Sequence, residues 1–371
     1  MGWRVDNELQ QMLRDSARGY LGDAGGPAHF RSVRASDSGF DADAWAQMGE
    51  LGWTGILLPE SAGGSGLGLE PALALAEELG QAIAPEPFIA SAIIAATILA
   101  SGEGPATHAL SSALAQGQRS VTLAWQEQHG TIAIPAFTTR LTDNRLNGRK
   151  IHVPAWHDDT ALLVAAASDD GPVVVDVDPS AAGVSIGRAR ATDGTWIAEI
   201  AFDGVFVSRD AVIVGGDAAR GALDLAIARG TVALSAQLEG LAGVLWRMTL
   251  DYMKQRSQFG SHLSDFQALR HQMVDLYSGI ELAAASWRHA GQAMDQGETF
   301  GPAVHTAKAR CSQVAQDMAR WAIQYHGAFG YTDEANVGLY VHSALRGASW
   351  LGNASAHRRA ALIAYRDGKG V

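Results

Sequence analysis

The stretch ALDLAIARGTVALSAQLEGLAGVLWRMTLDYMKQ, residues 222–255, decides the fold class of this chain. It contains no proline, and its large apolar residues recur at spacings of three and four, which is the repeat of one face of an α-helix. These residues are Leu223, Ile227, Leu234, Leu238, Leu241, Leu245 and Met248. A helix of this length runs about 50 Å. Because its apolar face has to be buried along that whole length, the stretch predicts a helical bundle.

Further helical patterns lie on both sides of this stretch. After it, residues 266–294 and 303–329 predict two more long helices of the bundle. Before it, residues 42–51 and 70–79 predict shorter helices, and Gly80 stands where a helix commonly ends.

Between the helical regions, from about residue 120 to 215, short apolar runs alternate with turn residues. The runs are residues 121–125, 161–165, 173–177 and 197–206, and the turn signals are residues 143–144, 147–148 and 169–172. The sequence therefore predicts a mainly α fold with a central β domain. We expect an N-terminal helical domain over 1–118, a middle β domain of barrel or sandwich type over 119–215, and a C-terminal four-helix bundle over 216–371.

Composition excludes several classes of protein. Of the 371 residues, 47% are apolar and 18% are charged, which is typical of a globular chain. The net charge of −11 and the absence of a basic block argue against a nucleic-acid partner. A single cysteine, Cys311, excludes a disulfide framework, and the histidines His152 and His157 have no clustered third ligand. We expect no metal site.

The apolar run over residues 88–100 is too short for a membrane helix, which needs roughly 20 residues. The first residues, MGWRVDN, contain no apolar signal core. We therefore expect no membrane span and a cytoplasmic protein.

Four motifs stand in order along the chain. They are LGWTGILLPE (51–60) followed by GGSGLG (63–68), LNGRK (146–150), KQRSQFG (254–260) with Phe266 and Gln267 after it, and QYHGAFGYTDE (324–334). Together they resemble the acyl-CoA dehydrogenase family, and the order of the predicted domains matches that family as well. The resemblance extends over nearly the whole chain.

This resemblance implies an FAD cofactor and assigns residues to it. The implied FAD-binding residues are Arg256, Phe259, Gly260, Gln267, Gln324 and Gly327. An arginine binds a pyrophosphate through its planar fork of donors, and glutamine offers both donors and acceptors. Glycine lets the backbone approach a cofactor closely. In the family, these elements reach the FAD that is seated on a neighbouring subunit.

The chain departs from the family at the catalytic base. Most members have a glutamate in a Tyr-Glu-Gly-Thr motif, and the matching stretch here places Leu351 at that position. The alternative family position, on the helix before KQRSQFG, is occupied by Gly230. Glu239 and Asp224 are the nearest carboxylates on this helix, but both fall on other faces. We therefore assign no catalytic residue to this chain.

A second departure concerns the seat of the flavin ring. Residues 124–131 lack the proline and the Gly-Ser-Asp of the family's Thr-Glu-Pro loop, and residues 151–156 replace its Trp-Ile-Thr/Ser element. One half of a shared FAD site is degraded and the other half is intact.

This pattern predicts the base-less subunit of an α₂β₂ acyl-CoA dehydrogenase, whose homologous partner bears the base. By family analogy, the substrate is an acyl-CoA, such as a steroid side-chain CoA, and an electron-transfer flavoprotein or similar protein accepts the electrons. Two alternatives are a self-contained flavin oxidase or monooxygenase and a cofactor-free interaction protein. Both keep the fold, so the fold alone does not separate them.

Overall fold

The computed structural model of this protein describes residues 6–332 and 334–366. The contacts divide the chain into two compact units, which we describe separately. The helical unit comprises the residues up to Phe30, Leu73–Ala84 and Thr231–Val371, and the sheet unit comprises Arg31–Ala72 and Pro85–Gly230. Three helices contribute residues to both units: α2 (Gly26–Ala35), α4 (Leu69–Gln81) and α7 (Gly216–Gln255). We describe α2 with the sheet unit and α4 with the helical unit.

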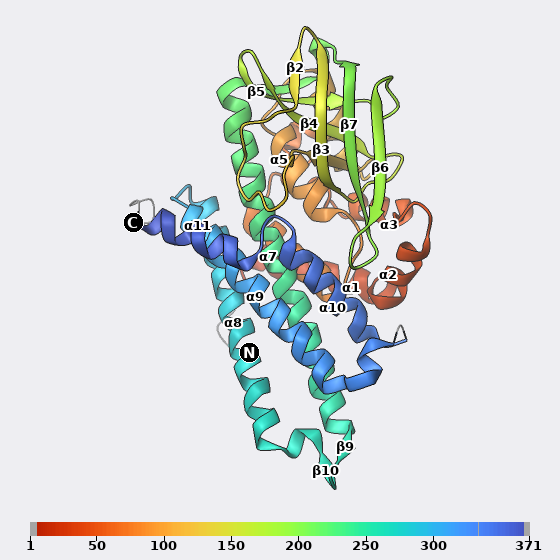
Figure 1. The fold of residues 1–371 in the computed structure, drawn as a ribbon, viewed down its shortest axis with the longest axis vertical. Helices are drawn as coiled ribbons and strands as arrows, with labels where there is room; N and C mark the ends of the chain where they lie inside the picture. Colours follow the sequence, from red (N-terminus) through yellow and green to blue (C-terminus); the bar gives the residue numbers. More distant parts are fainter. Residues whose placement is uncertain (1–5, 333, 367–371) are drawn as a thin grey trace. The chain divides into compact units, whose positions relative to one another are not determined.

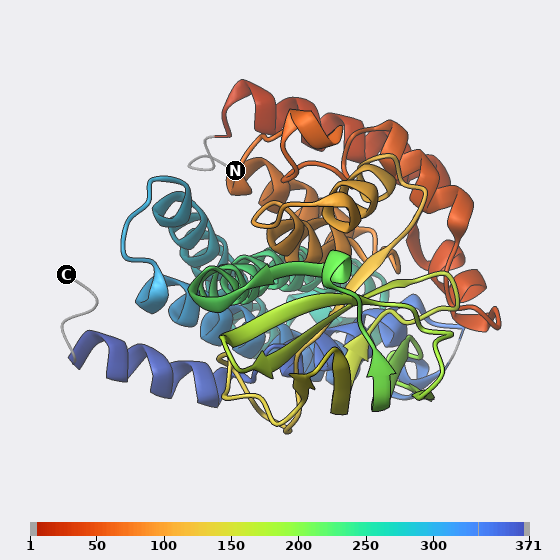
Figure 2. The ribbon, with the colours of Figure 1, turned by 90° about the horizontal axis from the view of Figure 1, so that it is seen from above.

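The helical unit is a bundle of helices, of which α8 to α11 are drawn in cyan and blue in Figures 1 and 2. Its centre is α9 (Gly301–His326), which packs against α8, α10 and α11. The other helices are α1 (Glu8–Ala24), α4 (Leu69–Gln81), α8 (Gln267–Asp295), α10 (Asn336–Ser349) and α11 (Ala354–Arg366). The predicted stretches 266–294 and 303–329 correspond to α8 and α9, and residues 222–255 lie within α7, so the helical bundle is confirmed.

Helices α4 and α7 approach each other at backbone distance through two glycines. A side chain at position 80 would overlap the carbonyl oxygen of Gln237, and one at position 240 would overlap that of Glu77. The expectation that Gly80 ends its helix is therefore wrong, since α4 continues through it to Gln81. Gly80 is needed for helix packing rather than for a helix terminus.

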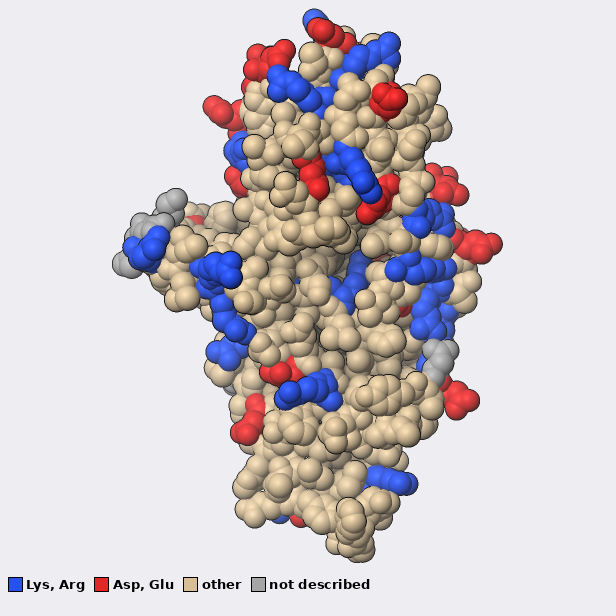
Figure 3. Space-filling model, viewed as in Figure 1, with Lys and Arg blue, Asp and Glu red and all other residues tan. Residues whose placement is uncertain are grey.

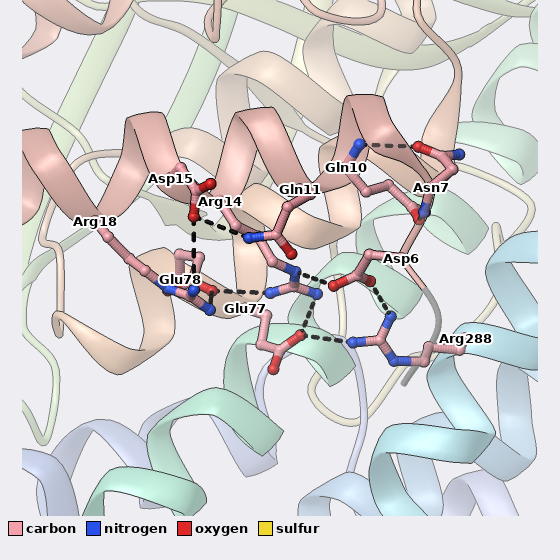
Figure 4. Close-up of polar contacts among 10 residues, drawn as sticks. All are labelled: Asp6, Asn7, Gln10, Gln11, Arg14, Asp15, Arg18, Glu77, Glu78 and Arg288. Carbon is pink, nitrogen blue, oxygen red and sulfur yellow. Dashed lines mark hydrogen bonds and ion pairs between the residues drawn. The ribbon is translucent and has the colours of Figure 1, made fainter. Parts of the chain in front are cut away.

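Buried ion pairs fasten α1 to α4 and α8. Arg14 is almost fully buried and donates to Asp6 (2.9 Å), Glu77 (2.7 Å) and Glu78 (2.9 Å), as Figure 4 shows. Arg288 of α8 donates to the same Asp6 (2.9 Å) and Glu77 (3.2 Å). Burial raises the pKa of Asp6, but the two guanidinium groups outweigh this effect and hold that pKa below its usual value.

The sheet unit contains one mixed sheet of eight strands in the order β6-β7-β3-β2-β4-β5-β8, with β1 parallel to β4. The strands are β1 (Val121–Ala124), β2 (Arg140–Thr142), β3 (Arg145–Pro154), β4 (Ala161–Ser168), β5 (Gly171–Val177), β6 (Val184–Arg190), β7 (Trp196–Phe206) and β8 (Val212–Gly215). The helices of this part are α2 (Gly26–Ala35), α3 (Ala42–Glu50), α5 (Ala96–Leu99), α6 (Pro105–Ala115) and the short turns η1 (Glu60–Ala62) and η3 (Arg209–Ala211). The predicted fold class, mainly α with a central β part, is confirmed.

Of the two Asn- or Asp-containing turn pairs that the sequence predicts in this part of the chain, one forms a turn and the other lies inside a strand. Asp143 and Asn144 both have positive φ and form the two-residue turn between β2 and β3. Asn147 and Gly148 do not form a turn, contrary to expectation, because they lie inside β3. The pairing of β3 with β7 shifts register between Leu146 and Gly148, so Gly148 lies in a β-bulge.

The apolar run over residues 88–100 is a core element of the sheet unit. It forms the π-helix η2 (Ile89–Ala95) followed by α5, and their side chains are buried. Ser91 donates from Oγ to the carbonyl oxygen of Val121 in β1 at 2.7 Å. Over the described ranges, no helix has the length and apolar character that crossing a membrane requires.

Candidate cofactor-binding site

The first implied cofactor-binding element is a hairpin at the end of α7. Strands β9 (Ser257–Gln258) and β10 (Ser261–His262) pair across a two-residue turn formed by Phe259 and Gly260, which both have positive φ. Figure 1 shows this hairpin beyond the end of α7. Phe259 is 94% exposed, an unusual environment for a phenyl ring. The hairpin therefore projects an aromatic side chain into solvent.

Polar residues flank the hairpin at both ends. Arg256 precedes it and is exposed, and within the described part of the chain it makes no ion pair. Gln267 begins α8 after the turn η4 (Leu263–Asp265) and is also exposed. The rings of Phe259 and Phe266 meet edge to face at 6.5 Å, which links the hairpin tip to the start of α8.

The second implied element is the end of α9. Gln324 is exposed in the last turn of this helix, and Gly327 ends it with φ of 60°. The turn η5 (Gly327–Tyr331) follows, and its Phe329 and Tyr331 are exposed aromatic residues. Exposed polar and aromatic side chains therefore occur together here, as they do at the hairpin.

Tyr252 brings these two elements together, and sequence reasoning missed it. Its ring stacks on His326 with centroids 4.4 Å apart and lies parallel to Phe329 at 6.5 Å. The amide of Arg256 donates to the carbonyl of Tyr252 at 2.8 Å, so the arginine lies one helical turn beyond this stack. An aromatic residue four positions before the arginine was the signal in the sequence. His326 donates from Nδ1 to Ala322 O (2.8 Å), and burial lowers its pKa, which fits a packing role.

The loop between α10 and α11 contains Leu351, which is 2% exposed and has a φ of 55°. Two neighbouring groups hold this loop. His357 donates from Nε2 to the carbonyl of Leu351 at 2.7 Å. Lys308 is fully buried and donates to the last carbonyls of α10, Gly347 O at 3.0 Å and Ala348 O at 3.3 Å. Burial lowers the pKa of Lys308 to about 7.

The other positions considered for a base differ in their surroundings. Gly230 is buried within α7. Glu239 lies in the core of the bundle, where the indole Nε1 of Trp287 donates to it at 3.4 Å. Asp224 is on the exposed side of α7, and burial raises its pKa although Arg220 lowers it.

In the sheet unit, residues 125–139 fold back on themselves around a buried ion pair. Lys150 is 0% exposed and donates to Glu127 at 2.6 Å, and Phe137 covers its ammonium group at 4.3 Å. Glu127 also accepts from the amides of Thr138 (2.7 Å) and Thr139 (2.9 Å). Burial raises the pKa of Glu127, but these hydrogen bonds outweigh it and lower the pKa to about 2. Burial lowers the pKa of Lys150 to about 8.

Two models of known protein families match this chain. The family model "Acyl-CoA dehydrogenase, N-terminal domain" matches residues 7–118, and "Acyl-CoA dehydrogenase, C-terminal domain" matches residues 218–363. The acyl-CoA dehydrogenase FadE28 of Mycobacterium tuberculosis is 32% identical over 266 residues, which cover 70% of this chain and 74% of that protein. The chain belongs to the acyl-CoA dehydrogenase family.

Solved structures agree with this assignment to the acyl-CoA dehydrogenases. A variant of the Tcur3481-Tcur3483 steroid ACAD is similar with a TM-score of 0.88 and 29% identity, over 98% of this chain and 99% of that chain. The ChsE4-ChsE5 complex from Mycobacterium tuberculosis has the same fold, with a TM-score of 0.88 and 23% identity over 98% of each chain. Acyl-CoA dehydrogenases bind FAD.

The two parts of this acyl-CoA dehydrogenase chain differ in their fit to FAD. Arg256, Gln267 and Gln324 hold exposed donors suited to a pyrophosphate and an adenine, so this part fits the cofactor. In the loop after β1, the amides of Thr138 and Thr139 and the ammonium of Lys150 bond Glu127, so these three donors are not available to a flavin ring. Among the described residues, no group of three or more metal-ligating side chains occurs.

Buried neutral histidines make the stability of the chain depend on pH. Burial lowers the pKa of His357 and of His157 from 6.5 to about 4. The unfolded chain therefore binds protons that the folded chain does not, so stability is full above about pH 6.5 and falls toward pH 4. We expect each histidine to reduce the free energy of unfolding by about 1 kcal/mol between pH 6.5 and 5.5.

Urea titrations at several pH values check this expectation. The His357→Gln variant should have a shallower dependence of the unfolding free energy on pH than the native chain. His108→Gln replaces an exposed histidine on α6 and is the matched control. Equal slopes for His357→Gln and the native chain would contradict the assignment.

Proposed function

We propose that this chain is the base-less subunit of a heteromeric, FAD-dependent acyl-CoA dehydrogenase. One observation carries the proposal: Arg256, Gln267 and Gln324 are exposed, whereas in the loop around Glu127 and Lys150 the ammonium of Lys150 and the amides of Thr138 and Thr139 bond Glu127. A homo-oligomer needs both halves of the site in each chain. A hetero-oligomer needs one half from each partner, and the partner of this chain is a homologous subunit that bears the catalytic carboxylate.

In this arrangement the residues of this chain bind and orient the cofactor. Arg256 holds the pyrophosphate with its fork of donors, and Gln267 and Gln324 bond the polar groups around it. Gly260 and Gly327 let the backbone come close, and Phe259 supplies an aromatic contact. FAD, when bound, supplies the two-electron acceptor for the desaturation of an acyl-CoA at Cα–Cβ.

The base is assigned to the partner because Leu351 has no titratable group. Removing the weakly acidic α-proton of a thioester requires a positioned base within hydrogen-bond reach. Leu351 and Gly230 are both buried in this chain, and neither offers a proton acceptor in its side chain. The role of this chain is therefore cofactor binding and assembly.

Exposed aromatic residues beside the polar ones support a partner contact. Phe259, Phe329 and Tyr331 are all more than half exposed and flank the proposed FAD-binding groups. Interfaces between proteins are enriched in such aromatic side chains. We expect an α₂β₂ assembly in the cytoplasm, with electrons passed to an electron-transfer flavoprotein or a similar acceptor.

The proposed substrate is an acyl-CoA thioester of the steroid side-chain CoA type. The support is the similarity to the Tcur3481-Tcur3483 steroid ACAD, whose name joins two proteins and contains the word steroid. Substrate screening of the assembled complex with short-chain, long-chain and steroid acyl-CoA thioesters tests this part separately.

Flavin absorbance of the purified chain tests the central proposal. We expect the chain alone to contain little FAD, and the chain co-expressed with a homologue that retains the glutamate and the Thr-Glu-Pro loop to contain bound FAD. The homologue expressed alone is the control. A lone chain that holds one FAD per polypeptide and oxidises acyl-CoA would refute the proposal.

A further inference from the structure

We propose that Tyr252 is a positioning residue for the cofactor, because its ring fixes the hairpin after α7 relative to the end of α9. This inference rests on the proposed function, since it concerns the two elements that are assigned to FAD. All of its residues belong to the helical unit. Tyr252 lies four positions before Arg256 and is half-buried.

The ring of Tyr252 stacks on residues that are far away in the sequence. It lies on the imidazole of His326 with the ring centroids 4.4 Å apart and the planes inclined by 26°. It is also parallel to the ring of Phe329, with an angle of 6° and the centroids 6.5 Å apart. The stack is therefore a direct contact between the helix that ends in the hairpin and the turn η5.

On the α7 side, short backbone bonds connect the stack to the proposed pyrophosphate-binding arginine. The carbonyl of Tyr252 accepts from the amide of Arg256 at 2.8 Å. The carbonyl of Arg256 accepts in turn from the amide of Leu263 at 2.9 Å, across the base of the hairpin. The backbone of Arg256 therefore follows the position of Tyr252.

The hairpin has no charged side chain of its own to hold it in place. Residues 257–262, SQFGSH, contain no Lys, Arg, Asp or Glu. Figure 3 shows few charged side chains around the place where Figure 1 draws β9 and β10, on the face in view. Packing and the connection to α7 therefore have a large part in orienting this segment.

On the α9 side, the stacked histidine lies between two other residues assigned to FAD, Gln324 and Gly327. His326 donates from Nδ1 to the carbonyl of Ala322 at 2.8 Å, which fixes the rotation of its ring. A side chain at Gly330 would approach the Cβ atom of His326 to 3.1 Å, so η5 packs closely on this histidine. The position of the stack therefore sets the position of this element as well.

The aromatic ring of Tyr252, rather than its hydroxyl group, makes this contact. The hydroxyl donates to the carbonyl of His326 at 3.5 Å, which is long for a hydrogen bond. Aromatic pairs stabilise a contact beyond the effect of the apolar area that they bury. Phenylalanine should therefore keep the contact, whereas leucine should weaken it.

One FAD molecule has to meet both elements at the same time. If the hairpin and the end of α9 moved independently, a fraction of the molecules would present Arg256 and Gln324 in the arrangement that binds. The apparent Kd rises by the inverse of that fraction. A stack that keeps the two elements together therefore increases the affinity without touching the cofactor.

Distances between spin labels in the chain alone test the positioning without a cofactor. Cys311 is 0% exposed, so labels attach selectively to cysteines introduced by Ser261→Cys in β10 and Ala328→Cys in η5, which are exposed positions. Electron paramagnetic resonance gives the distribution of the distances between the labels. We expect a narrow distribution in this background and with Tyr252→Phe, and a broader one with Tyr252→Leu. Equal widths for Tyr252→Leu and the background would overturn the proposal.

Titration of the deflavinated complex with FAD tests the consequence for the cofactor. Tyr252→Leu should raise the Kd about three- to tenfold, and Tyr252→Phe should restore near-native affinity. Tyr277→Leu is the matched control, because Tyr277 of α8 also packs its ring against an aromatic residue of α7, Trp246, at 5.0 Å. It should leave the affinity unchanged. If Tyr252→Phe binds FAD as weakly as Tyr252→Leu, or if Tyr277→Leu weakens binding equally, the proposal fails.

The two measurements separate a failure of this inference from a failure of the proposed function. A native complex that binds no FAD would refute the proposed function, and the label distances would still decide whether Tyr252 holds the two elements together. A native complex that binds FAD, with equal affinity for Tyr252→Leu, would refute the positioning role alone. If Tyr252→Leu fails to fold, His326→Leu removes the other half of the stack and takes over both tests.

Discussion

Replacing Arg14 by methionine should lower the free energy of unfolding by about 3–5 kcal/mol. Arg14 is almost fully buried and bonds Asp6, Glu77 and Glu78 at 2.7–2.9 Å. Its loss leaves these carboxylates desolvated with fewer partners, and an unpaired buried charge is costly. Methionine fills much of the same volume, so the effect reports on charge rather than on a cavity. Urea denaturation followed by circular dichroism measures it.

Arg18→Met is the control for this prediction. Arg18 bonds the same Glu78 at 2.7 Å, but its side chain is 55% exposed. Solvent screens an exposed pair, so we expect a cost of about 1 kcal/mol or less. Equal losses for the two variants would mean that the burial of Arg14 does not set its contribution.

Replacing Arg256 by glutamine should weaken FAD binding to the assembled complex by about 10- to 100-fold. This range corresponds to the loss of one or two charge-assisted hydrogen bonds, about 1.5–3 kcal/mol. Arg256 is exposed, so the unfolding free energy of the chain itself should stay unchanged. Titration of the deflavinated complex with FAD, followed by quenching of flavin fluorescence, gives the affinity.

Lys254→Gln is the matched variant for this test. It removes a neighbouring exposed cation, whose nearest carboxylate is Asp251 at 3.5 Å. We expect near-native FAD affinity for this variant. Normal flavin content in Arg256→Gln would exclude a role for this arginine at the pyrophosphate, and an equal loss in Lys254→Gln would point to general electrostatic attraction.

The fold was predictable where the information is local. Helical periodicity located α7, α8 and α9, and the turn pair Asp143-Asn144 located the hairpin between β2 and β3. The prediction of a turn at Asn147-Gly148 is wrong because the same residue types occur in turns and in β-bulges. Only the pairing of β3 with β7 distinguishes the two.

The site was predictable in part. Motifs select Arg256 and Gln324 as FAD-binding residues, and this role stays a prediction. The aromatic residue four positions before Arg256 is visible in the sequence, but its stacking partner His326 lies 74 positions away, so the contact itself could not be predicted locally. The ion pair of Lys150 with Glu127 was missed for the same reason, since its partners are 23 positions apart and belong to different elements. Charged residues in a sequence usually indicate a solvated surface, and burial becomes apparent only from the fold.

The glycine contact between α4 and α7 affects how future alignments of relatives should be read. Because Gly80 and Gly240 each face a carbonyl of the opposite helix, neither position can accept a larger residue unless the two helices separate. Both glycines should therefore be nearly invariant among homologues, including those that differ in substrate, cofactor content or assembly. Their conservation would record how closely two helices pack and would carry no information about catalysis.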